Sequence, residues 1–285
     1  RDRLRSRGLG DVYKRQLGII GGSFAKALAK YTDHHIIGIN RSEKPLQDAL
    51  ACGAIHEIGT RESIKTADMI ILGTFPEAAV KFVRDNADII PKSCIVTDTS
   101  GIKGQICPEL VQLSKEYGFK FIGGHPMAGK ETNGFASSDA DLFQNASYII
   151  VPCGADEKDI SFVSTLMKKI GFGIIKVATP EEHDRMIAYT SQLPHVIACA
   201  YVLNESCANH KGFSAGSYRD VSRVARINVP LWTELFSENR NSLVSELDEF
   251  IENMTSIRNA IAESNNDAVA ELLSRARDVK ERTDG

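Results

Sequence analysis

Short runs of continuous apolar residues recur through the first half of the chain, separated by stretches with helical periodicity. Two of these stretches span residues 77–86 and 104–117. Continuous apolar runs are typical of strands that are buried on both faces of a mostly parallel sheet, which helices cover. The pattern therefore predicts a Rossmann-like α/β domain. Its expected strands are residues 35–39, 69–72, 94–97, 120–122, 148–151 and 173–177.

The second half of the chain carries only helical patterns. Strand signals stop before Pro180, which is followed by Glu181 and Glu182. This is a favourable helix start, because proline suits the first helical position and acids suit the positive end of the helix dipole. We therefore expect a domain boundary near residue 178. Residues 17–178 form the predicted α/β domain, and residues 179–285 an all-α domain.

One long helix of the second domain carries a stripe of apolar residues. Their spacings alternate between four and three, which is the heptad pattern of a coiled-coil seam. The seam consists of Leu243, Leu247, Phe250, Met254, Ile257 and Ile261. Such a seam can pack inside the domain, but its length favours contact with a second copy of the chain, as in a helical dimerisation domain. A last helix is expected at residues 267–280.

The first sixteen residues do not fit this pattern. They carry five arginines and one lysine and show neither strand nor helix periodicity. A nucleotide-binding βαβ unit begins instead with a buried apolar strand that leads into a glycine-rich turn. Two interpretations compete: a disordered basic arm, or a non-native segment that replaces the original start of the domain. We favour the second, and we expect residues 1–16 to make few packed contacts and to form no well-ordered apolar strand.

Composition and charge narrow the possible partners. A net charge of −3 at pH 7 offers no basic surface of the kind that nucleic acid requires. No apolar run approaches the roughly 20 residues of a membrane span, and the N-terminus has no apolar core of a secretion signal. The six cysteines show no metal-binding or paired spacing, which is typical of reduced thiols. We therefore expect a cytoplasmic protein that binds neither nucleic acid nor membrane.

Residues 17–29 have the pattern of a turn that runs into an amphipathic helix. Aligned with G-x-G-x-x-G, the second and third glycines are Gly18 and Gly21, whereas Gln16 takes the first position. Glycine lets the backbone approach a pyrophosphate, and the helix N-terminus supplies N–H donors and a positive dipole. The expected cofactor contacts here are Gly18, Ile20, Gly21, Gly22 and Ser23.

The residues after the next strand should contact the adenosine ribose. An acidic residue at this position accepts hydrogen bonds from the ribose hydroxyls of NAD and repels the 2′-phosphate of NADP. Here the position is Asn40, followed by Arg41 and Ser42. Two interpretations stay open. Asn40 can bond the ribose hydroxyls of NAD while Arg41 stacks on adenine, or the Arg41 guanidinium can pair with the phosphate of NADP.

Ligands of parallel sheets bind beyond the carboxyl ends of the strands. Three segments are expected at that edge: residues 73–76 with Thr74 and Pro76, residues 98–103 with Ser100, and residues 123–129 with His125. A neutral imidazole can accept a proton near pH 7. The glycines around His125 let a substrate come close to the backbone, and Pro126 restricts the chain after it. A lone histidine in such a turn is usually incidental, so its sequence context decides.

That context resembles a known family. Residues 123–134, GGHPMAGKETNG, resemble the GGHPMAG-x-E-x-x-G signature of prephenate dehydrogenases. Residues 98–103, DTSGIK, are similar to the family's D-x-x-S-x-K motif, except that the serine position falls on Gly101 and the hydroxyl stands one residue earlier, at Ser100. Asp98 and Lys103 have an equally good structural interpretation, as a helix-capping acid and a solvated lysine.

The helical half continues the resemblance. Residues 190–195, TSQLPH, resemble the family's T-S-H-L-P-H, with Gln192 replacing the first histidine and His195 keeping the second. Pro194 should kink this helix and free a backbone carbonyl. The residues His183, Ile187, Ser191 and His195 are spaced by four and share one helix face.

A last pair of matches concerns the substrate. Residues 216–225, GSYRDVSRVA, look like the family's G-[FY]-[KR]-D-x-[ST]-R-[IV]-A. Arg223 then takes the position that binds a substrate carboxylate, and a guanidinium suits bidentate carboxylate recognition. Trp232 follows at the family's spacing, either as a core residue or as a wall of the pocket.

The resemblance covers nearly all of residues 17–285 and implies oxidative decarboxylation of prephenate to 4-hydroxyphenylpyruvate, in tyrosine biosynthesis, by a homodimer with NAD or NADP. It favours NAD slightly. It implies that His125 accepts the proton of the ring hydroxyl, that Ser100 and His195 assist, and that Arg223, Ser191 and Trp232 bind substrate. Because the sequence ends soon after its last expected helix, we expect no regulatory ACT domain of the kind that some relatives carry.

Three alternatives remain. Arogenate dehydrogenase is the nearest, but its substrate carries an ammonium for which no acidic partner is evident beside His195. A β-hydroxyacid dehydrogenase has the same two-domain plan, but the lysine motif of that class is not found in the sequence. The third is a nucleotide-binding pseudoenzyme without catalysis, which the unusual first sixteen residues favour to some extent.

Overall fold

The apolar runs of the first half form strands where the sequence predicts them. In the computed structural model, which describes residues 7–10, 17–130, 132 and 134–284, five of the six predicted strands build a sheet in the order β4-β5-β6-β7-β8. All neighbours are parallel except β6 and β7, so the mostly parallel sheet is confirmed. The strands are β4 (Met69–Leu72), β5 (Ile95–Asp98), β6 (Lys120–Met127), β7 (Ser147–Val151) and β8 (Ile174–Val177).

A second, three-stranded sheet corrects the prediction for the N-terminus. It has the order β1-β2-β3, with β1 (Arg7–Gly10), β2 (His35–Ile39) and β3 (Glu57–Ile58), and β1 also contacts β4. We expected residues 1–16 to form no well-ordered apolar strand, yet Arg7–Gly10 pairs in parallel with β2, with Leu9 opposite Gly38. Backbone groups form these ladders, so a strand can pair without the apolar side chains that pattern analysis requires. Residues 1–6 and 11–16, including Gln16, lie outside the described residues.

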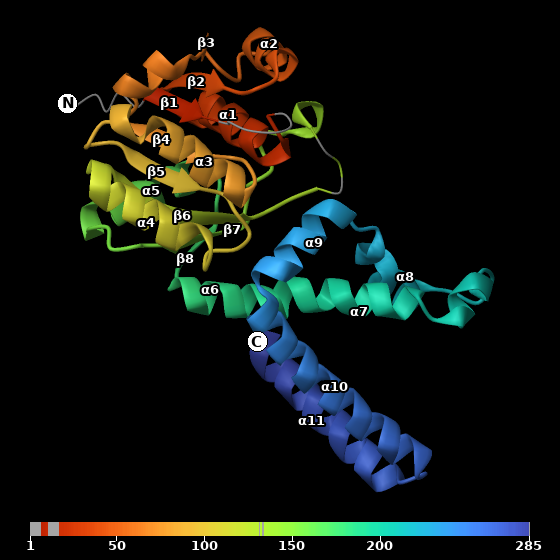
Figure 1. Cartoon of the computed structure of the whole chain (residues 1–285). Coiled ribbons are helices and arrows are strands. Elements are labelled where there is room, and N and C mark those ends of the chain that lie inside the picture. Colours follow the sequence, from red (N-terminus) through yellow and green to blue (C-terminus); the bar gives the residue numbers. More distant parts are fainter. Residues whose placement is uncertain (1–6, 11–16, 131, 133, 285) are drawn as a thin grey trace. The chain divides into compact units, whose positions relative to one another are not determined.

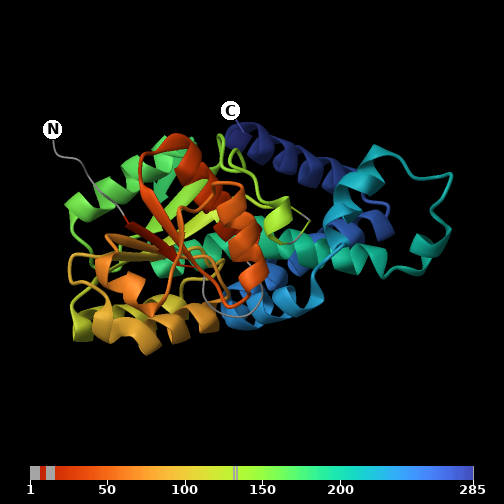
Figure 2. The same cartoon turned by 90° about the horizontal axis from the view of Figure 1, so that it is seen from above.

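Helices cover both faces of the sheet (Figures 1 and 2). They are α1 (Ile19–Tyr31), α2 (Glu43–Ala51), α3 (Pro76–Asn86), α4 (Ile106–Tyr117) and α5 (Glu157–Lys169), with short 3₁₀ turns η1 (Arg61–Thr66), η2 (Ala87–Ile89) and η3 (Phe135–Ser137). Alternate residues of a strand face opposite sides. In β4, Met69 and Ile71 pack in one core with α1 and α5, and Ile70 and Leu72 pack in another with α3 and α4. This double burial explains the continuous apolar runs.

The chain separates into two compact units, Arg1–Asp184 and Arg185–Gly285. The division lies within α6 (Pro180–Ile187), whereas the sequence places the boundary near residue 178. The second unit is helical, as expected. It contains the π-helical turn η4 (Ala188–Gln192), α7 (Leu193–Val202), η5 (Glu205–Asn209), α8 (Gly216–Ser222), η6 (Arg223–Ala225), α9 (Val229–Glu238), α10 (Arg240–Ala262) and α11 (Asn266–Asp284).

The last two helices run side by side as a hairpin (Figure 1), and the predicted seam lies on α10. Its first part is internal: Leu243 is buried with Ala188 and Leu193, and Leu247 and Phe250 pack against them. Its last part is exposed, with Met254 52% and Ile261 62% accessible. Among the described residues, no helix combines the length and the apolar character needed to cross a membrane.

Candidate active site

The carboxyl end of β5 is anchored by a buried ion pair. The Asp98 carboxylate pairs with Lys103 Nζ and accepts hydrogen bonds from the backbone N–H groups of Ser100 (2.9 Å) and Gly124 (3.0 Å). Lys103 also donates to the carbonyl oxygen of Gly124. Both side chains are completely buried. The interpretation of Lys103 as a solvated lysine is therefore wrong: the pair joins the loop after β5 to β6.

His125 lies on β6, opposite Ile149 of β7, and not in a loop. The preceding residue must be glycine. A Cβ on Gly124 would lie 2.0 Å from the Tyr148 hydroxyl oxygen and 2.7 Å from the carbonyl oxygen of Asp98. We expected the glycines to admit a substrate, but at Gly124 the space is filled by the protein's own core. The effect is that β6 can carry its histidine close against β5.

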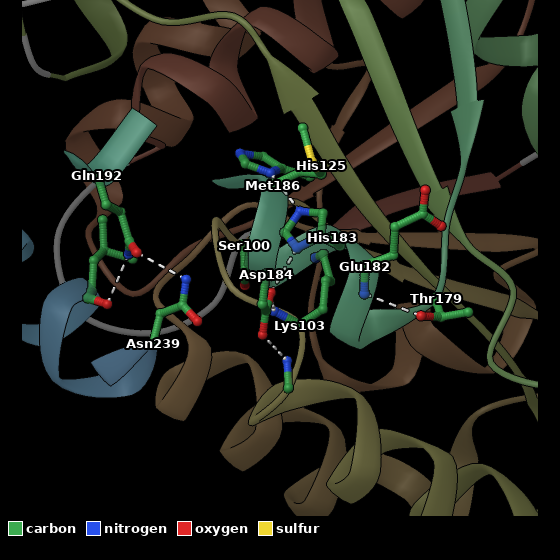
Figure 3. Close-up of polar contacts among 12 residues, drawn as sticks. Ser100, Lys103, His125, Thr179, Glu182, His183, Asp184, Met186, Gln192 and Asn239 are labelled. Carbon is green, nitrogen blue, oxygen red and sulfur yellow. Dashed lines mark hydrogen bonds and ion pairs between the residues drawn. The ribbon is translucent and has the colours of Figure 1, made fainter. Parts of the chain in front are cut away.

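The imidazole of His125 is the start of a hydrogen-bonded chain (Figure 3). Its Nδ1 lies 2.8 Å from Nε2 of His183, and Nδ1 of His183 lies 2.7 Å from Oδ1 of Asp184. The Asp184 carboxylate in turn accepts the backbone N–H groups of Lys103 (2.8 Å) and Gly104 (2.6 Å). The sequence placed His183 only on a helix face and assigned no role to Asp184. The sequence does place a histidine next to an aspartate, directly after the two glutamates that begin α6. This adjacent His-Asp pair is the feature that could have drawn attention to them.

This environment keeps the two imidazoles neutral. Burial, His183 and Lys103 hold the pKa of His125 well below its ordinary value, although the residue as a whole is only half-buried. Burial also lowers the pKa of His183, against the opposing effect of Asp184. A neutral His125 can accept a proton at pH 7.

Ser100 follows directly in the anchored loop. Its hydroxyl is buried and has no hydrogen-bond partner among the described residues. A buried hydroxyl without a partner costs free energy that a ligand group can restore. Although Gly101 stands at the serine position of the family motif, Ser100 still supplies a hydroxyl in the same loop.

The predicted cofactor residues surround the start of α1 and the ends of β2 and β4. Gly18 is the N-cap of α1, and the first turn of α1 contains no acidic residue. A Cβ on Gly22 would lie 2.8 Å from atoms of Phe135 and Ser138, so this glycine serves packing. The Ser23 hydroxyl accepts the N–H of Asp139 (2.9 Å). Ile20 and Gly21 are half-buried, as are Asn40 and Thr74, whereas Arg41 and Ser42 are exposed and Pro76 is buried at the start of α3.

The Asn40 side chain already has one role in its turn. Its amide donates to the carbonyl oxygen of Ser42 at 3.1 Å. This bond orients the amide oxygen and nitrogen in a loop whose next side chain, Arg41, is exposed. Both interpretations of the cofactor preference thus stay compatible with the geometry.

In the second unit, the structure brings together three of the predicted site residues, His195, Ser191 and Trp232. His195 stacks on Trp232, with ring centroids 3.8 Å apart, and its Nδ1 lies 2.7 Å from the carbonyl oxygen of Ser191. Instead of a simple kink, the turn before Pro194 is π-helical, a geometry that is frequent at functional sites. Arg223 is exposed at the start of η6, which contacts α7.

Gln192, where the family motif has its first histidine, has a structural role. It is buried, donates to the carbonyl oxygen of Leu235 (3.0 Å) and accepts from the Asn239 amide (2.8 Å). These bonds tie the π-helical turn to the junction of α9 and α10 (Figure 3). The substitution therefore removes an imidazole from the motif and replaces it with a buried link.

Comparison with known proteins places these observations in a family. Residues 24–176 match the nucleotide-binding domain of prephenate dehydrogenase, and residues 179–275 match its dimerization domain. A cyclohexadienyl dehydrogenase of Zymomonas mobilis is 30% identical over 90% of this chain and 89% of its own length. A prephenate dehydrogenase of Bacillus subtilis is 28% identical over 93% of this chain and 74% of its own. The fold is that of the A. aeolicus prephenate dehydrogenase solved with hydroxyphenyl propionate and NAD+ (TM-score 0.85, 23% identity, 99% and 100% coverage).

Proposed function

Since the chain belongs to the prephenate dehydrogenase family of oxidoreductases, we propose that it catalyses the NAD-dependent oxidative decarboxylation of prephenate to 4-hydroxyphenylpyruvate. The observation that carries the proposal most directly is the neutral, partly accessible His125 at the end of the parallel part of the sheet. Its lowered pKa keeps a proton acceptor available at pH 7.

The residues of the first unit fit a nicotinamide dinucleotide. Gly18 caps α1 without a side chain, and the first turn of α1 has no carboxylate that would repel a pyrophosphate. The residues proposed to hold the cofactor are Gly18, Ile20, Gly21, Gly22, Ser23, Asn40, Arg41, Ser42, Thr74 and Pro76. When bound, the nicotinamide supplies the hydride acceptor.

His125 is the proposed base. As hydride leaves the ring carbon that bears the hydroxyl, that carbon gains carbonyl character, and the hydroxyl proton moves to the imidazole. Ser100 offers a second hydrogen-bonding group in the adjacent loop. Loss of CO₂ then makes the ring aromatic and needs little from the protein beyond orientation.

The two carboxylates of prephenate require cationic or donor groups. We assign a carboxylate to Arg223, with His195 and Ser191 as further partners and Trp232 as an apolar wall. His195 carries a proton on Nδ1, because this atom faces the carbonyl oxygen of Ser191, and a carbonyl can only accept. Its Nε2 is then the ring atom that remains for a ligand.

Arg223→Ala should act mainly on substrate affinity. Loss of a carboxylate partner should raise KM for prephenate and cost about 2–4 kcal/mol in kcat/KM. Steady-state kinetics measure this, with Arg219→Ala as the control, since Arg219 lies on α8, directly before η6, and its side chain is 78% exposed. A variant with lowered kcat and unchanged KM would show that the role of Arg223 has been misassigned.

The decisive test of the proposed function is a spectrophotometric assay of the full chain with prephenate and arogenate, each against NAD and NADP. We expect reduction of NAD with prephenate as the preferred pair. Faster turnover of arogenate would favour the alternative dehydrogenase. Cofactor binding without turnover of either substrate would favour a pseudoenzyme. A preference for NADP would assign phosphate binding to Arg41.

We also propose that the helical unit forms a homodimer, because it matches a dimerization domain and leaves part of its seam exposed at Met254 and Ile261. Light scattering at micromolar concentration should give twice the chain mass. Met254→Glu with Ile261→Glu should shift the mass towards the monomer, whereas Ser256→Glu, on the same helix but off the seam, should not. A folded wild-type monomer would contradict the proposal.

A further inference from the structure

We propose that His183 and Asp184 are positioning residues that select the tautomer of His125, so that its Nδ1 carries the hydrogen and its Nε2 is the atom that accepts the substrate proton. The proposal deepens the proposed function, since it rests on His125 as the base. It follows from the direction in which each hydrogen bond of the chain must run (Figure 3).

The direction is set at the carboxylate end. The hydrogen bonds that Asp184 accepts include those from the backbone N–H groups of Lys103 and Gly104 and from Nδ1 of His183. A carboxylate flanked by N–H donors acts as an acceptor, so the hydrogen between His183 and Asp184 belongs to Nδ1 of His183. In a neutral imidazole with Nδ1 protonated, Nε2 can only accept.

The next bond then has only one orientation. Nε2 of His183 faces Nδ1 of His125 at 2.8 Å, and an acceptor there requires a hydrogen on Nδ1 of His125. The second ring nitrogen of His125, Nε2, is left with its lone pair. Such second-partner control of a histidine tautomer is a general way to aim an imidazole.

The Asp184 carboxylate is held firmly enough to fix the direction of these hydrogen bonds. A Cβ on Gly104 would lie 2.8 Å from Oδ2 of Asp184, so the absence of a side chain at position 104 is what lets the backbone N–H approach the carboxylate. His183 is 1% exposed, so its ring nitrogens are shielded from bulk solvent. The loop after β5 and the start of α6 thus act together on one histidine of β6.

The groups around His125 that oppose its protonation are each paired with a carboxylate. Lys103 lies in the loop after β5 and opposes protonation of His125, as does His183 on α6. Asp98 neutralises Lys103 by direct pairing, and Asp184 acts through His183. When Nε2 of His125 takes the substrate proton, its Nδ1 keeps its hydrogen bond to His183, and the carboxylate behind His183 stabilises the new positive charge.

Asp184→Asn tests the proposal. An amide cannot accept from all three donors, so His183 should turn its tautomer, and His125 should place its hydrogen on Nε2. We expect kcat to fall roughly 10- to 10³-fold with KM and NAD binding little changed. The acid limb of the pH profile should also move to lower pH, because a carboxylate that favours protonated His125 is gone. Glu182→Gln is the matched control, since Glu182 lies in the same turn of α6 but pairs outward with Lys176 (3.7 Å).

A spectroscopic readout separates this inference from the proposed function. The ¹⁵N chemical shifts of the ring nitrogens distinguish protonated from unprotonated atoms, and the His125 signals are identified by their loss in His125→Asn. We expect a protonated Nδ1 in the wild type and a protonated Nε2 in Asp184→Asn. A wild type with protonated Nδ1 but no turnover of prephenate would overturn the function and leave the tautomer assignment standing.

Two further variants cover the case in which Asp184→Asn does not fold. Gly104→Ala should displace the Asp184 carboxylate while the side chains of His125, His183 and Asp184 all remain. It should therefore alter the His125 tautomer. His183→Gln keeps an acceptor for His125 but loses the link to Asp184, so kcat should fall less than in His183→Phe. A wild-type His125 protonated on Nε2, or variants with unchanged ¹⁵N shifts and kcat within twofold of wild type, would overturn the proposal.

Discussion

His125→Asn is expected to lower kcat by roughly 10²–10⁴-fold while NAD binding stays intact. The imidazole is the group proposed to take the hydroxyl proton, and asparagine has no basic atom to replace it. Asparagine is nevertheless small enough for β6 and keeps a donor near His183, so the fold should tolerate the change. Steady-state kinetics with prephenate measure kcat, and isothermal titration calorimetry measures NAD binding.

The control is the same substitution at a histidine that lies outside the proposed site. The Nδ1 of His56 accepts the N–H of Ile36 at 3.0 Å, and its ring stacks on His35, so both contacts are structural. His56→Asn should therefore leave kcat largely unchanged. If His125→Asn retained near-wild-type kcat, the base would have to be another group.

The pH profile of the wild type should also reflect the role of His125 as the base. Protonated His125 cannot accept a proton, so kcat/KM should fall on the acid side. The pKa of His125 is held well below its ordinary value of about 6.5 by burial, His183 and Lys103. The fall should therefore begin only below about pH 6.5, and His125→Asn should lack it. An acid limb centred above pH 7 would show that another group controls activity.

The sheet could be predicted well because its strands are buried on both sides. In β4, all four residues are buried, so the apolar run and the strand coincide. β6 was predicted too short, since its apolar signal ends at Ile122 while the strand continues to Met127. Glycines and proline hide that continuation from pattern analysis, yet the antiparallel pairing with β7 holds it in place. β1 was missed for a related reason, because a β-ladder is formed by backbone groups, which leave no apolar pattern in the sequence.

The candidate site could be predicted only in part. His125 stands within a motif of adjacent residues, and local sequence therefore identifies it. His183 is 58 residues further along, and the contact between the two rings depends on how β6 and α6 fold together. Lys103 shows the same limit. A lysine in a loop suggests a solvated side chain, and only the fold shows that Asp98 is near enough to keep it buried.

Removal of the buried ammonium should have the largest effect on stability. Lys103→Met leaves the Asp98 carboxylate buried with two backbone N–H partners and no counter-charge, which should destabilise the first unit by about 3–5 kcal/mol. This corresponds to a fall in Tm of roughly 6–20 °C for a unit of this size. Thermal unfolding followed by far-UV circular dichroism measures the fall in Tm. The single tryptophan, Trp232, belongs to the other unit, so its fluorescence reports separately whether that unit is disturbed.

The double variant Asp98→Asn with Lys103→Met distinguishes loss of a charge partner from loss of packing. It contains no unpaired buried charge, so it should be more stable than Lys103→Met alone, although both remove the same lysine atoms. Arg84→Met breaks an exposed pair with Glu109, whose side chains are 59% and 52% accessible, and should change Tm little. If the double variant were less stable than Lys103→Met, the lysine would act through its hydrocarbon packing and its bond to Gly124. The buried ion pair would then not be what holds β5 against β6.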